Sequence, residues 1–428
     1  MILIKDGRVI DPQTGLDETL DLVIQDGVIK EIGKFQESDS YEKVIHAKGN
    51  VVAPGLVDVH VHFRDPGFTY KEDVETGARA AAAGGYTTVI CMANTRPVVD
   101  NVETLEDLRK REENLPVHVY NTAAVTMGLQ GNELTDMPKL LQAGAIGFTD
   151  DGIPIKDEKL VLAAMKAAKE LDVPISFHEE DPDLIGNSGI NSGKVAKQLG
   201  LEGAPALAEE VLVARDCLLA LRTGAKINIQ HVSSEVSVQI IRLMKKMGAN
   251  VFAEVTPQHF SLTEEAVLKK GTLAKVNPPL RTERDRYALI RGLKEDVLDI
   301  IATDHAPHSN EEKAKELKSA PSGMIGLETA LALGITNLVR KGHITLPHLL
   351  KKMTMIPAGL YGLDCGCIKK GGRADLVIFN EREKWRVEKF QSKSANSPFI
   401  GEELYGKVKY TICRGQIVYT DEEEKNES

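Results

Sequence analysis

The sequence predicts an α/β protein with a (β/α)8 TIM-type barrel and a small β-sandwich domain built from both chain ends. Three observations lead to this prediction. Apolar strand-like runs alternate with helical patterns eight times in the middle of the chain. Short β-rich runs broken by turns occupy both ends, and neither end alone would bury much of a core. No glycine-rich phosphate-binding fingerprint follows the first central strand, which argues against a doubly wound open sheet.

The two chain ends share one pattern, so we expect a single small domain from residues 1–53 and 365–428. Its predicted strands are Met1–Lys5, Leu22–Gln25, Val28–Ile32, Val44–Ala47, 374–379, 407–412 and 416–419. Asp6-Gly7 and Asp26-Gly27 supply the positive φ angles that hairpin turns need. The charged tail from Asp421 to Ser428 is expected to be disordered.

Residues 54–364 are expected to form the barrel, whose catalytic groups would lie at the carboxyl ends of its strands. The predicted strands are 56–62, 86–92, 117–123, 145–150, 174–178, 226–231, 250–255 and 298–303. The predicted helices include 71–83, 156–171, 206–222 and 235–247.

Composition points to an ordinary acidic enzyme of the cytoplasm. The net charge of -10 argues against nucleic acid as the main partner, because phosphate binding needs a basic face. The N-terminus lacks the pattern of a signal peptide, and no apolar stretch is long enough to span a bilayer. Five thinly scattered cysteines do not suggest a disulfide framework, and Cys365 and Cys367 are expected to lie in a loop.

The first central strand carries a potential metal-binding pair. Because side chains alternate along a strand, Asp58, His60 and His62 share one face, opposite the valines between them. If the valines face the helices, both imidazoles point into the barrel mouth, where they suit a divalent metal. An HxH motif alone is weak support.

Further strand ends strengthen the metal hypothesis. Asp150-Asp151 end the fourth strand, His178 the fifth, His231 the sixth and Asp304-His305 the eighth. Histidine is rare in this sequence, with 11 residues, so this repetition at one edge of the barrel favours a shared site. Imidazoles and carboxylates suit Zn²⁺, although Co²⁺, Mn²⁺ or Fe²⁺ could bind similar ligands.

Two segments closely resemble the signatures of dihydroorotases, which belong to the amidohydrolase superfamily. They are Asp58-Val-His-Val-His-Phe-Arg-Asp-Pro-Gly67 and Ala302-Thr-Asp-His-Ala-Pro-His308, the second followed by Lys313. The resemblance continues through Pro54-Gly55, 92–95, 148–152, 277–280, 321–323 and 374–377, and so covers nearly the whole chain.

The resemblance implies one or two Zn²⁺ ions per subunit, most simply two. His60, His62 and Asp304 would hold one metal, and His178 and His231 the other. Many relatives bridge the metals with a carboxylated lysine, where this chain has aspartates. We expect Asp151 to bridge, with Asp150 as the alternative; Lys156 lies too far along the chain to substitute.

The implied reaction is hydrolysis of a cyclic amide. A bound metal lowers the pKa of water from ~15.7 toward ~7, which makes metal-bound hydroxide the expected nucleophile. Asp304 is expected to shuttle the proton, with a role as a plain ligand as the alternative. Arg64 lies two residues after His62 and is expected to continue the same strand alternation, where its guanidinium can hold a substrate carboxylate. By the resemblance, His62, Asn94 and His308 also contact substrate, as do Asn277, Ser322 and Gly323 on the ring side.

The substrate expected from this site is a cyclic amide that carries a carboxylate. The leading hypothesis is interconversion of N-carbamoyl-L-aspartate and L-dihydroorotate, within pyrimidine synthesis. Alternatives are a hydantoinase or allantoinase activity, or a noncatalytic scaffold that binds aspartate carbamoyltransferase. A homodimer is also expected. Residues 308–322 form either a mobile loop over the substrate or a solvated surface helix.

Overall fold

Eight short parallel strands form a closed barrel in the computed structural model, which describes residues 1–422. The strands are β6 (Leu56–Val61), β7 (Tyr86–Cys91), β8 (His118–Asn121), β9 (Phe148–Thr149), β10 (Ile175–Phe177), β11 (Ile227–Ile229), β12 (Val251–Val255) and β13 (Ile300–Ile301). They pair in sequence order within two sheets, β6 to β8 and β9 to β13. Parallel bridges from Ala123 to Phe148 and from Val61 to His305 join the two sheets. The predicted barrel is therefore confirmed.

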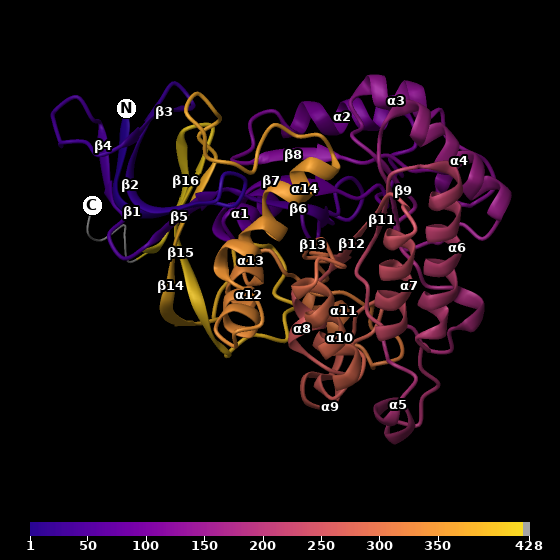
Figure 1. The fold of residues 1–428 in the computed structure, drawn as a ribbon. Helices are drawn as coiled ribbons and strands as arrows, with labels where there is room; N and C mark the ends of the chain where they lie inside the picture. Colours follow the sequence, from indigo (N-terminus) through magenta and orange to yellow (C-terminus); the bar gives the residue numbers. More distant parts are fainter. Residues whose placement is uncertain (423–428) are drawn as a thin grey trace.

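Helices surround the barrel on its outer side (Figure 1). They include α1 (Val74–Ala83), α2 (Val102–Glu112), α3 (Met137–Ala143), α4 (Glu158–Leu171), α6 (Leu207–Thr223), α7 (Glu235–Lys246), α10 (Glu283–Lys294), α12 (Ala330–Gly334), α13 (Leu346–Met353) and α14 (Met355–Leu360). Side-chain caps fix where several begin. Asp73 accepts a hydrogen bond from the backbone N–H of Thr76, so α1 starts at Val74 rather than at the predicted Lys71.

The two chain ends form one eight-stranded sheet beside the barrel, as predicted (Figure 1). Its strands are β1 (Ile2–Asp11), β2 (Leu16–Gln25), β3 (Val28–Gly33), β4 (Lys43–His46), β5 (Val51–Pro54), β14 (Leu376–Arg386), β15 (Glu403–Cys413) and β16 (Gln416–Thr420). N-terminal β5 pairs with C-terminal β14 and so joins the two ends. Ile4, Leu22, Val52 and Ile378 share one buried apolar cluster. The domain limits at residues 53/54 and 364/365 stay a prediction.

One of the two predicted hairpin turns is wrong. Asp6-Gly7 lies inside β1, where the pairing with β2 shifts register between Ile4 and Gly7, as in a β-bulge. A side chain at Gly7 would meet Val52 Cγ2 at 2.5 Å, so close packing rather than a turn explains this glycine. Asp26-Gly27 does form the turn between β2 and β3, with φ values of 52° and 79°.

The expectation of a disordered tail is wrong at its first residue. Asp421 is buried, and its carboxylate lies 2.9 Å from Lys407 Nζ. Its backbone N–H donates to the carbonyl of Lys409. Positions 423–428 lie outside the described residues. Within residues 1–422, no helix is both long and apolar enough to cross a membrane, and all five cysteines are free.

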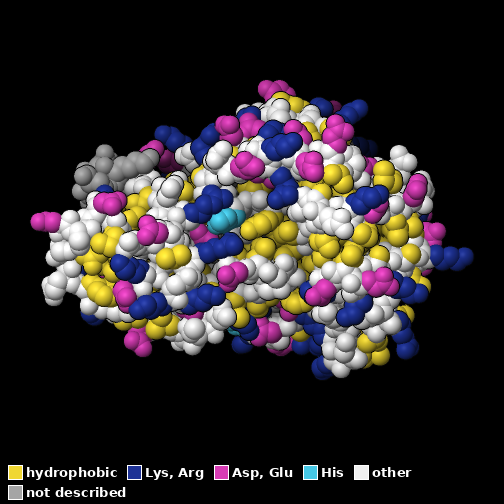
Figure 2. Space-filling view, turned by 90° about the horizontal axis from the view of Figure 1, so that it is seen from above, with side chains coloured by type: hydrophobic (Ala, Val, Ile, Leu, Met, Phe, Trp, Pro, Cys, Tyr) yellow, Lys and Arg dark blue, Asp and Glu magenta, His cyan; other side chains and the backbone are white. Residues whose placement is uncertain are grey.

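Basic and acidic side chains are interspersed on the face of the molecule seen in Figure 2, with apolar side chains exposed between them. This face carries no continuous basic stripe of the kind that binds a phosphate backbone.

Candidate metal centre

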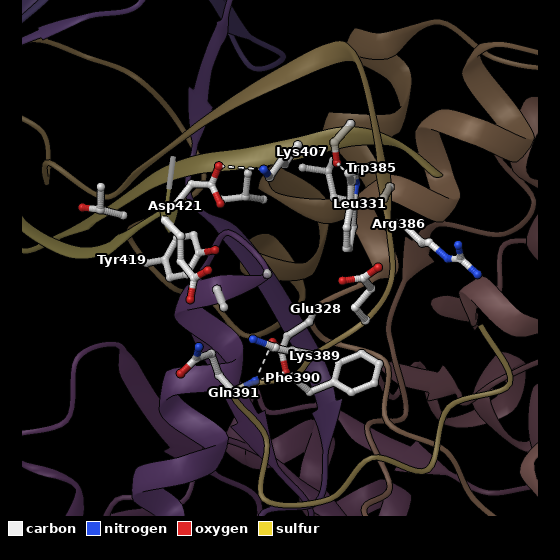
Figure 3. A pocket seen from close by; sticks show the side chains of 18 residues that line it. Glu328, Leu331, Trp385, Arg386, Lys389, Phe390, Gln391, Lys407, Tyr419 and Asp421 are labelled. Atoms are coloured by element: carbon white, nitrogen blue, oxygen red, sulfur yellow. Dashed lines mark hydrogen bonds and ion pairs between the residues drawn. The ribbon is translucent and has the colours of Figure 1, made fainter. Parts of the chain in front are cut away.

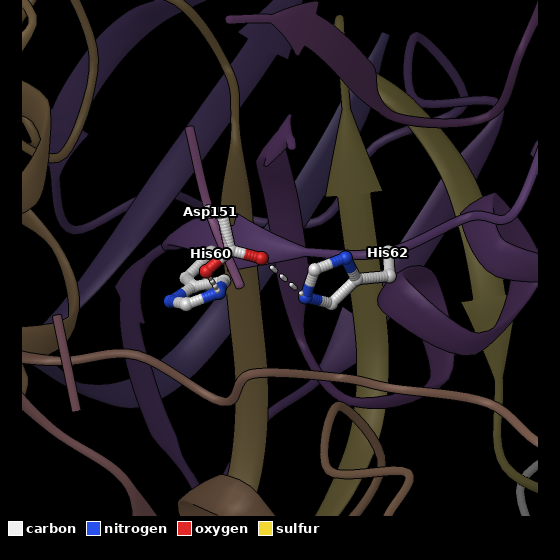
Figure 4. A group of neighbouring side chains, drawn as sticks. All are labelled: His60, His62 and Asp151. Atoms are coloured by element: carbon white, nitrogen blue, oxygen red, sulfur yellow. Dashed lines mark ion pairs between the residues drawn. The ribbon is translucent and has the colours of Figure 1, made fainter. Parts of the chain in front are cut away.

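His60, His62 and Asp151 meet at the carboxyl end of the barrel strands (Figure 4). His60 is the fifth residue of β6, His62 follows the end of that strand, and Asp151 follows β9. Their carboxylate and imidazole atoms converge: His60 Nε2 lies 3.4 Å from Asp151 Oδ1, and His62 Nε2 lies 3.4 Å from Asp151 Oδ2. All three side chains are buried. The face-sharing predicted for the histidines thus brings both onto one carboxylate.

His178 and His231 form a second group with the same aspartate. His178 follows β10, and its Nδ1 lies 3.6 Å from Asp151 Oδ1. The His178 and His231 rings meet edge to face, with centroids 4.5 Å apart. Asp151, His178 and His231 form a second group whose ligand atoms lie within 4.8 Å of one another. Asp151 therefore belongs to both groups.

Asp304 completes the cluster from the eighth strand. Its Oδ1 lies 3.1 Å from His62 Nε2 and 3.4 Å from His60 Nε2. The backbone of Asp304 is left-handed, with φ of 49°, and the same is true of His231 at 33° and Arg64 at 60°. Such φ values are uncommon outside glycine and gather where function demands a particular side-chain direction. These three residues therefore adopt an unfavourable backbone conformation, and this conformation sets the direction of their side chains.

Each histidine that points at Asp151 has its far nitrogen held by an acceptor outside the cluster. His60 Nδ1 lies 3.1 Å from Glu254 Oε2, His62 Nδ1 3.0 Å from Asn94 Oδ1 and His178 Nε2 3.2 Å from Glu180 Oε2. In the neutral ring, which is the form that binds a metal, an acceptor there places the proton on the far nitrogen and leaves the near nitrogen with its lone pair. These tautomers suit metal ligands.

The donor set fits a divalent cation. Two buried atoms at its centre, His60 Nε2 and Asp151 Oδ1, lack a hydrogen-bond partner, which is costly unless something else satisfies them. Imidazoles combined with carboxylates are ligands that Zn²⁺ and its neighbours in the first transition row prefer.

The pKa values of His178 and Asp151 also indicate that the cluster needs positive charge. Although burial opposes it, Asp151 and Glu180 raise the pKa of His178 to about 10. Burial also works against ionisation of Asp151, but His60 and His178 hold the pKa of that carboxyl well below its usual range. The cluster thus balances buried carboxylates with protons on imidazoles, and a bound cation would replace those protons.

Asp150 and Lys156, the other two candidates from the sequence, face elsewhere. Asp150 Oδ1 accepts hydrogen bonds from the backbone N–H groups of Val125 and Thr126 at 2.8 and 3.0 Å. Lys156 forms an ion pair with exposed Asp183. Of these residues, only Asp151 points toward the histidines.

Arg64 reaches the rim of the site by a route that the sequence did not predict. Strand alternation ends with β6 at Val61, so the idea that Arg64 continues the His60–His62 face is wrong. The left-handed turn at Arg64 aims the side chain instead, and its Nε donates to the carbonyl of Pro307 at 3.2 Å. Burial lowers the pKa of the guanidinium. Among residues 1–422, the Arg64 Nη groups have no hydrogen-bond partner, which leaves them available to an anion.

Asn94 and His308 occupy different positions relative to Arg64. Asn94 bridges the metal cluster: its Oδ1 accepts from His62, and its Nδ2 donates to Asp151 Oδ2 at 2.9 Å. His308 instead binds the loop that follows it: its Nε2 donates to the carbonyl of Ser322 at 2.8 Å. Burial, together with the positive charges of Arg64 and Lys71, lowers the pKa of His308 to about 3. His308 is therefore neutral at pH 7.

Asn277, Ser322 and Gly323 lie together beyond His308. Asn277 Oδ1 and Ser322 Oγ are buried without a hydrogen-bond partner. Gly323 has φ of 130°, and a Cβ there would meet His308 Nε2 at 3.0 Å, so only glycine fits. Gly189 approaches from the loop after β10; a Cβ on it would meet Ser322 Oγ at 2.4 Å and Asn277 Oδ1 at 3.1 Å.

Residues 308–322 contain one short helix, α11 (Asn310–Lys313), followed by turns. Buried Lys313 donates to the carbonyls of Pro321 and Gly323, and Lys275 donates to three further carbonyls between residues 317 and 320. Glu312 forms an ion pair with Lys71 at 2.9 Å. The segment is neither a long surface helix nor free of the barrel in this conformation.

Known proteins place the chain in a family. Residues 49–237 match a family model described as dihydro-orotase-like. A dihydroorotase of Clostridioides difficile is 61% identical over 419 residues, which cover 98% of this chain and 100% of the relative. A dihydroorotase of Clostridium acetobutylicum is 58% identical, with 98% and 100% covered. The chain belongs to the dihydroorotase family.

Solved structures show that the fold is shared more widely than this family. An L-hydantoinase (dihydropyrimidinase) from Arthrobacter aurescens has a TM-score of 0.87 at 26% identity, over 98% of this chain and 96% of that one. A D-hydantoinase has a TM-score of 0.85 at 25% identity. Because fold alone does not fix substrate, the much higher identity to dihydroorotases carries more weight.

The sequence of this dihydroorotase family member did not reveal the hydrogen-bond acceptors that orient its histidine ligands. Glu254 lies inside apolar β12 and is fully buried. A carboxylate within a short apolar strand could have been recognised as a functional signal. Glu180, two residues after His178, offered no such signal, because it lies in a polar stretch.

A separate hollow of about 390 Å³ lies between α12 and the C-terminal strands (Figure 3). Trp385, Phe390, Tyr419 and Glu328 are among the residues that line it. The Glu328 carboxylate accepts hydrogen bonds from the backbone N–H groups of Gln391 and Ser392. Glu328 thus holds the chain segment that forms one wall, and none of the predicted site residues lines this hollow.

Proposed function

We propose that this protein is a dihydroorotase that interconverts L-dihydroorotate and N-carbamoyl-L-aspartate at a centre that would hold two Zn²⁺ ions, with Asp151 as a ligand shared by both. The observation that carries the proposal is the position of Asp151, which belongs to both ligand groups: its Oδ1 faces His60 and His178, and its Oδ2 faces His62. Close identity to dihydroorotases along the whole chain supports the substrate assignment.

His60, His62 and Asp304 would hold one ion, and His178 and His231 the other. When bound, such cations acidify water and polarise an amide carbonyl. The protein's contribution is to fix the ligands: Glu254, Asn94 and Glu180 hold the far ring nitrogens of three histidines. A fixed ligand set needs little reorganisation during the reaction.

Asp304 is the proposed proton shuttle. In hydrolysis, water adds its oxygen to the ring carbonyl carbon, and the bond from that carbon to the ring nitrogen breaks. Asp304 accepts the proton that leaves water and returns it to the departing nitrogen, so protons balance over the cycle. Its carboxylate is suitably placed, beside His60 and His62 and partly open to the barrel mouth, with 12% of the side chain exposed.

Substrate choice is assigned to Arg64 with Asn94 and His308. A guanidinium whose Nε already binds Pro307 still presents its Nη donors, which can grip a carboxylate through charge-assisted hydrogen bonds. Asn277 Oδ1 and Ser322 Oγ have no hydrogen-bond partner in the protein and would bind the amide groups of the substrate ring. Gly323, which has no side chain, leaves room for the ring. Hydantoin and allantoin lack the carboxylate that Arg64 would bind.

The direction of the reaction follows from the carboxylate that must be attacked in ring closure. Acid neutralises this carboxylate and favours cyclisation, whereas alkali favours hydrolysis.

Metal analysis with an activity assay tests the proposal. The catalytic centre of the purified protein should hold two zinc equivalents and turn over dihydroorotate, and Asp304→Asn should lower kcat by about 10²–10⁴-fold with metal still bound. A protein that binds no metal when supplied with Zn²⁺, and whose activity is unaffected by Asp304→Asn, would support the scaffold alternative instead.

We also infer a cytoplasmic homodimer. Six large apolar side chains stand exposed on the adjoining helices α6 and α7 and at the end of α7, a pattern that marks an association surface. They are Leu207, Val211, Leu218, Val236, Leu243 and Met247. Light scattering on Leu243→Glu, expected to be monomeric, tests this inference. Co-purification with aspartate carbamoyltransferase would test the further association.

A further inference from the structure

A second group of metal-binding side chains lies at the opposite end of the barrel, where the barrel meets the small sheet. His118 is the first residue of β8, Asp375 immediately precedes β14, and Cys413 is the last residue of β15. One imidazole nitrogen, one carboxylate oxygen and one sulfur from these residues lie within 4.8 Å of one another. Three segments distant in sequence thus bring three different donors to one point.

The geometry of the cluster suits a small cation. His118 Nε2 lies 3.0 Å from Asp375 Oδ2. Cys413 is 1% exposed, and its Sγ donates to the carbonyl of Thr87 at 3.8 Å. Ligand atoms bind zinc at about 2.0 to 2.3 Å from the metal. Donor atoms that all lie within 4.8 Å of one another are therefore close enough to share one ion.

A route to solvent exists on the histidine side. The His118 side chain is 14% exposed, whereas that of Asp375 is 4% exposed. Cys365 lies nearby: its Sγ accepts a hydrogen bond from Thr88, the residue paired with His118 on the neighbouring strand. An ion could therefore enter past His118 and find a second sulfur close to the cluster.

We propose that His118, Asp375 and Cys413 bind a structural divalent cation of the borderline-soft class, such as Zn²⁺, which fastens the small sheet to the barrel. A site at the amino-terminal end of the strands is remote from the catalytic edge and is expected to serve stability. The surrounding contacts are already those of a junction: Asp375 accepts from the backbone N–H groups of Gly55 and Arg414, and Arg414 donates to the carbonyl of Leu115.

Binding at this site requires proton release. Burial raises the pKa of the Cys413 thiol to about 12, so the thiol is neutral at pH 7 without a cation. The cation takes the place of the thiol proton, which passes to solvent.

Cobalt substitution separates this site from the catalytic centre. Thiolate-bound Co²⁺ shows a sulfur-to-metal charge-transfer band in the near ultraviolet, and the catalytic cluster contains only nitrogen and oxygen donors. Titration of the full-length protein with Co²⁺ should produce this band with one equivalent of metal, in addition to the equivalents bound at the catalytic centre. Cys413→Ser should abolish the band and reduce the rise in melting temperature that metal binding produces. Dihydroorotate turnover should persist.

Three control variants make the test specific. Cys217→Ser removes a buried thiol in α6, and Cys367→Ser removes a more accessible one; both should keep the band. His118→Gln should weaken the affinity for the Co²⁺ equivalent at this site by about tenfold or more. This variant tests the site independently in case Cys413→Ser does not fold. Absence of the band in the wild type, its persistence in Cys413→Ser, or unchanged affinity in His118→Gln would overturn the proposal.

Discussion

His60 Nδ1 lies 3.1 Å from Glu254 Oε2, and both side chains are fully buried. Asn228 donates to the other oxygen of the same carboxylate. Asn228 therefore holds the Glu254 carboxylate in place, and Glu254 in turn orients the His60 ring. His60 can present its Nε2 to Asp151 in only one tautomer.

Replacement of Glu254 by glutamine should weaken metal binding without removing a ligand. The new amide N–H₂ group would face either His60 or Asn228, both of which donate hydrogen bonds at this position. We expect the affinity for Zn²⁺ to fall by about 10- to 100-fold, as measured by competition with a chelator. Glu265→Gln, on the exposed surface, is the matched control. Equal affinities in the two variants would contradict the role of Glu254.

The adjacent aspartates should respond in opposite ways. Asp151→Asn should reduce bound zinc, because its carboxylate faces three histidines. Asp150→Asn should retain zinc but lower the melting temperature, because Asp150 holds the backbone at Val125 and Thr126. Elemental analysis and thermal unfolding of both variants measure these effects. Loss of zinc in the Asp150 variant alone would reverse the assignment of the bridge.

Arg64→Gln should impair substrate recognition and leave the metals in place. Loss of charge-assisted hydrogen bonds to a carboxylate, at about 1.5–3 kcal/mol, corresponds to a fall of about 10- to 100-fold in kcat/KM for dihydroorotate. Activity on hydantoin, which has no carboxylate, should change little. A similar loss with both substrates would mean that Arg64 maintains the fold of the site and does not select substrate.

Glu112 should make stability depend on pH. Burial raises its pKa from 4.5 to about 7, although Asn121 donates to the carboxylate. The folded state therefore binds this proton more tightly than the unfolded state. The stabilisation is complete below pH 4.5 and is lost as the pH rises through 7. The difference of about 2.5 pH units, at about 1.36 kcal/mol each, amounts to about 3 kcal/mol.

Glu112→Gln should remove that dependence. Relative to the wild type, the unfolding free energy of the variant should improve by about 3 kcal/mol between pH 4.5 and 7, as followed by denaturant titration. Exposed Glu113→Gln should track the wild type. A parallel pH course for Glu112→Gln and the wild type would show that Glu112 is not responsible.

Much of the fold could be predicted because periodicity reports burial directly. Valines at alternate positions of β6 and the aspartate-glycine turn after β2 carried strong local signals. Asp6-Gly7 misled because only Asp6 has a positive φ here, in a β-bulge, and the glycine is explained by close packing against Val52.

The site was predictable to the extent that its residues end strands. His60, His178 and Asp304 were found in this way. Glu254 was missed because its role depends on contact with His60, 194 positions away in sequence. The direction of Arg64 was misjudged because β6 ends before it, and a left-handed residue follows no strand alternation.

The most direct test of the function is the ratio of kcat/KM for L-dihydroorotate to that for hydantoin, measured on the zinc-loaded protein. A centre with Arg64 at its rim should turn over dihydroorotate far faster, and chelation should abolish that activity until Zn²⁺ is restored. Faster turnover of hydantoin, or dihydroorotate turnover that survives complete removal of metal, would contradict the account.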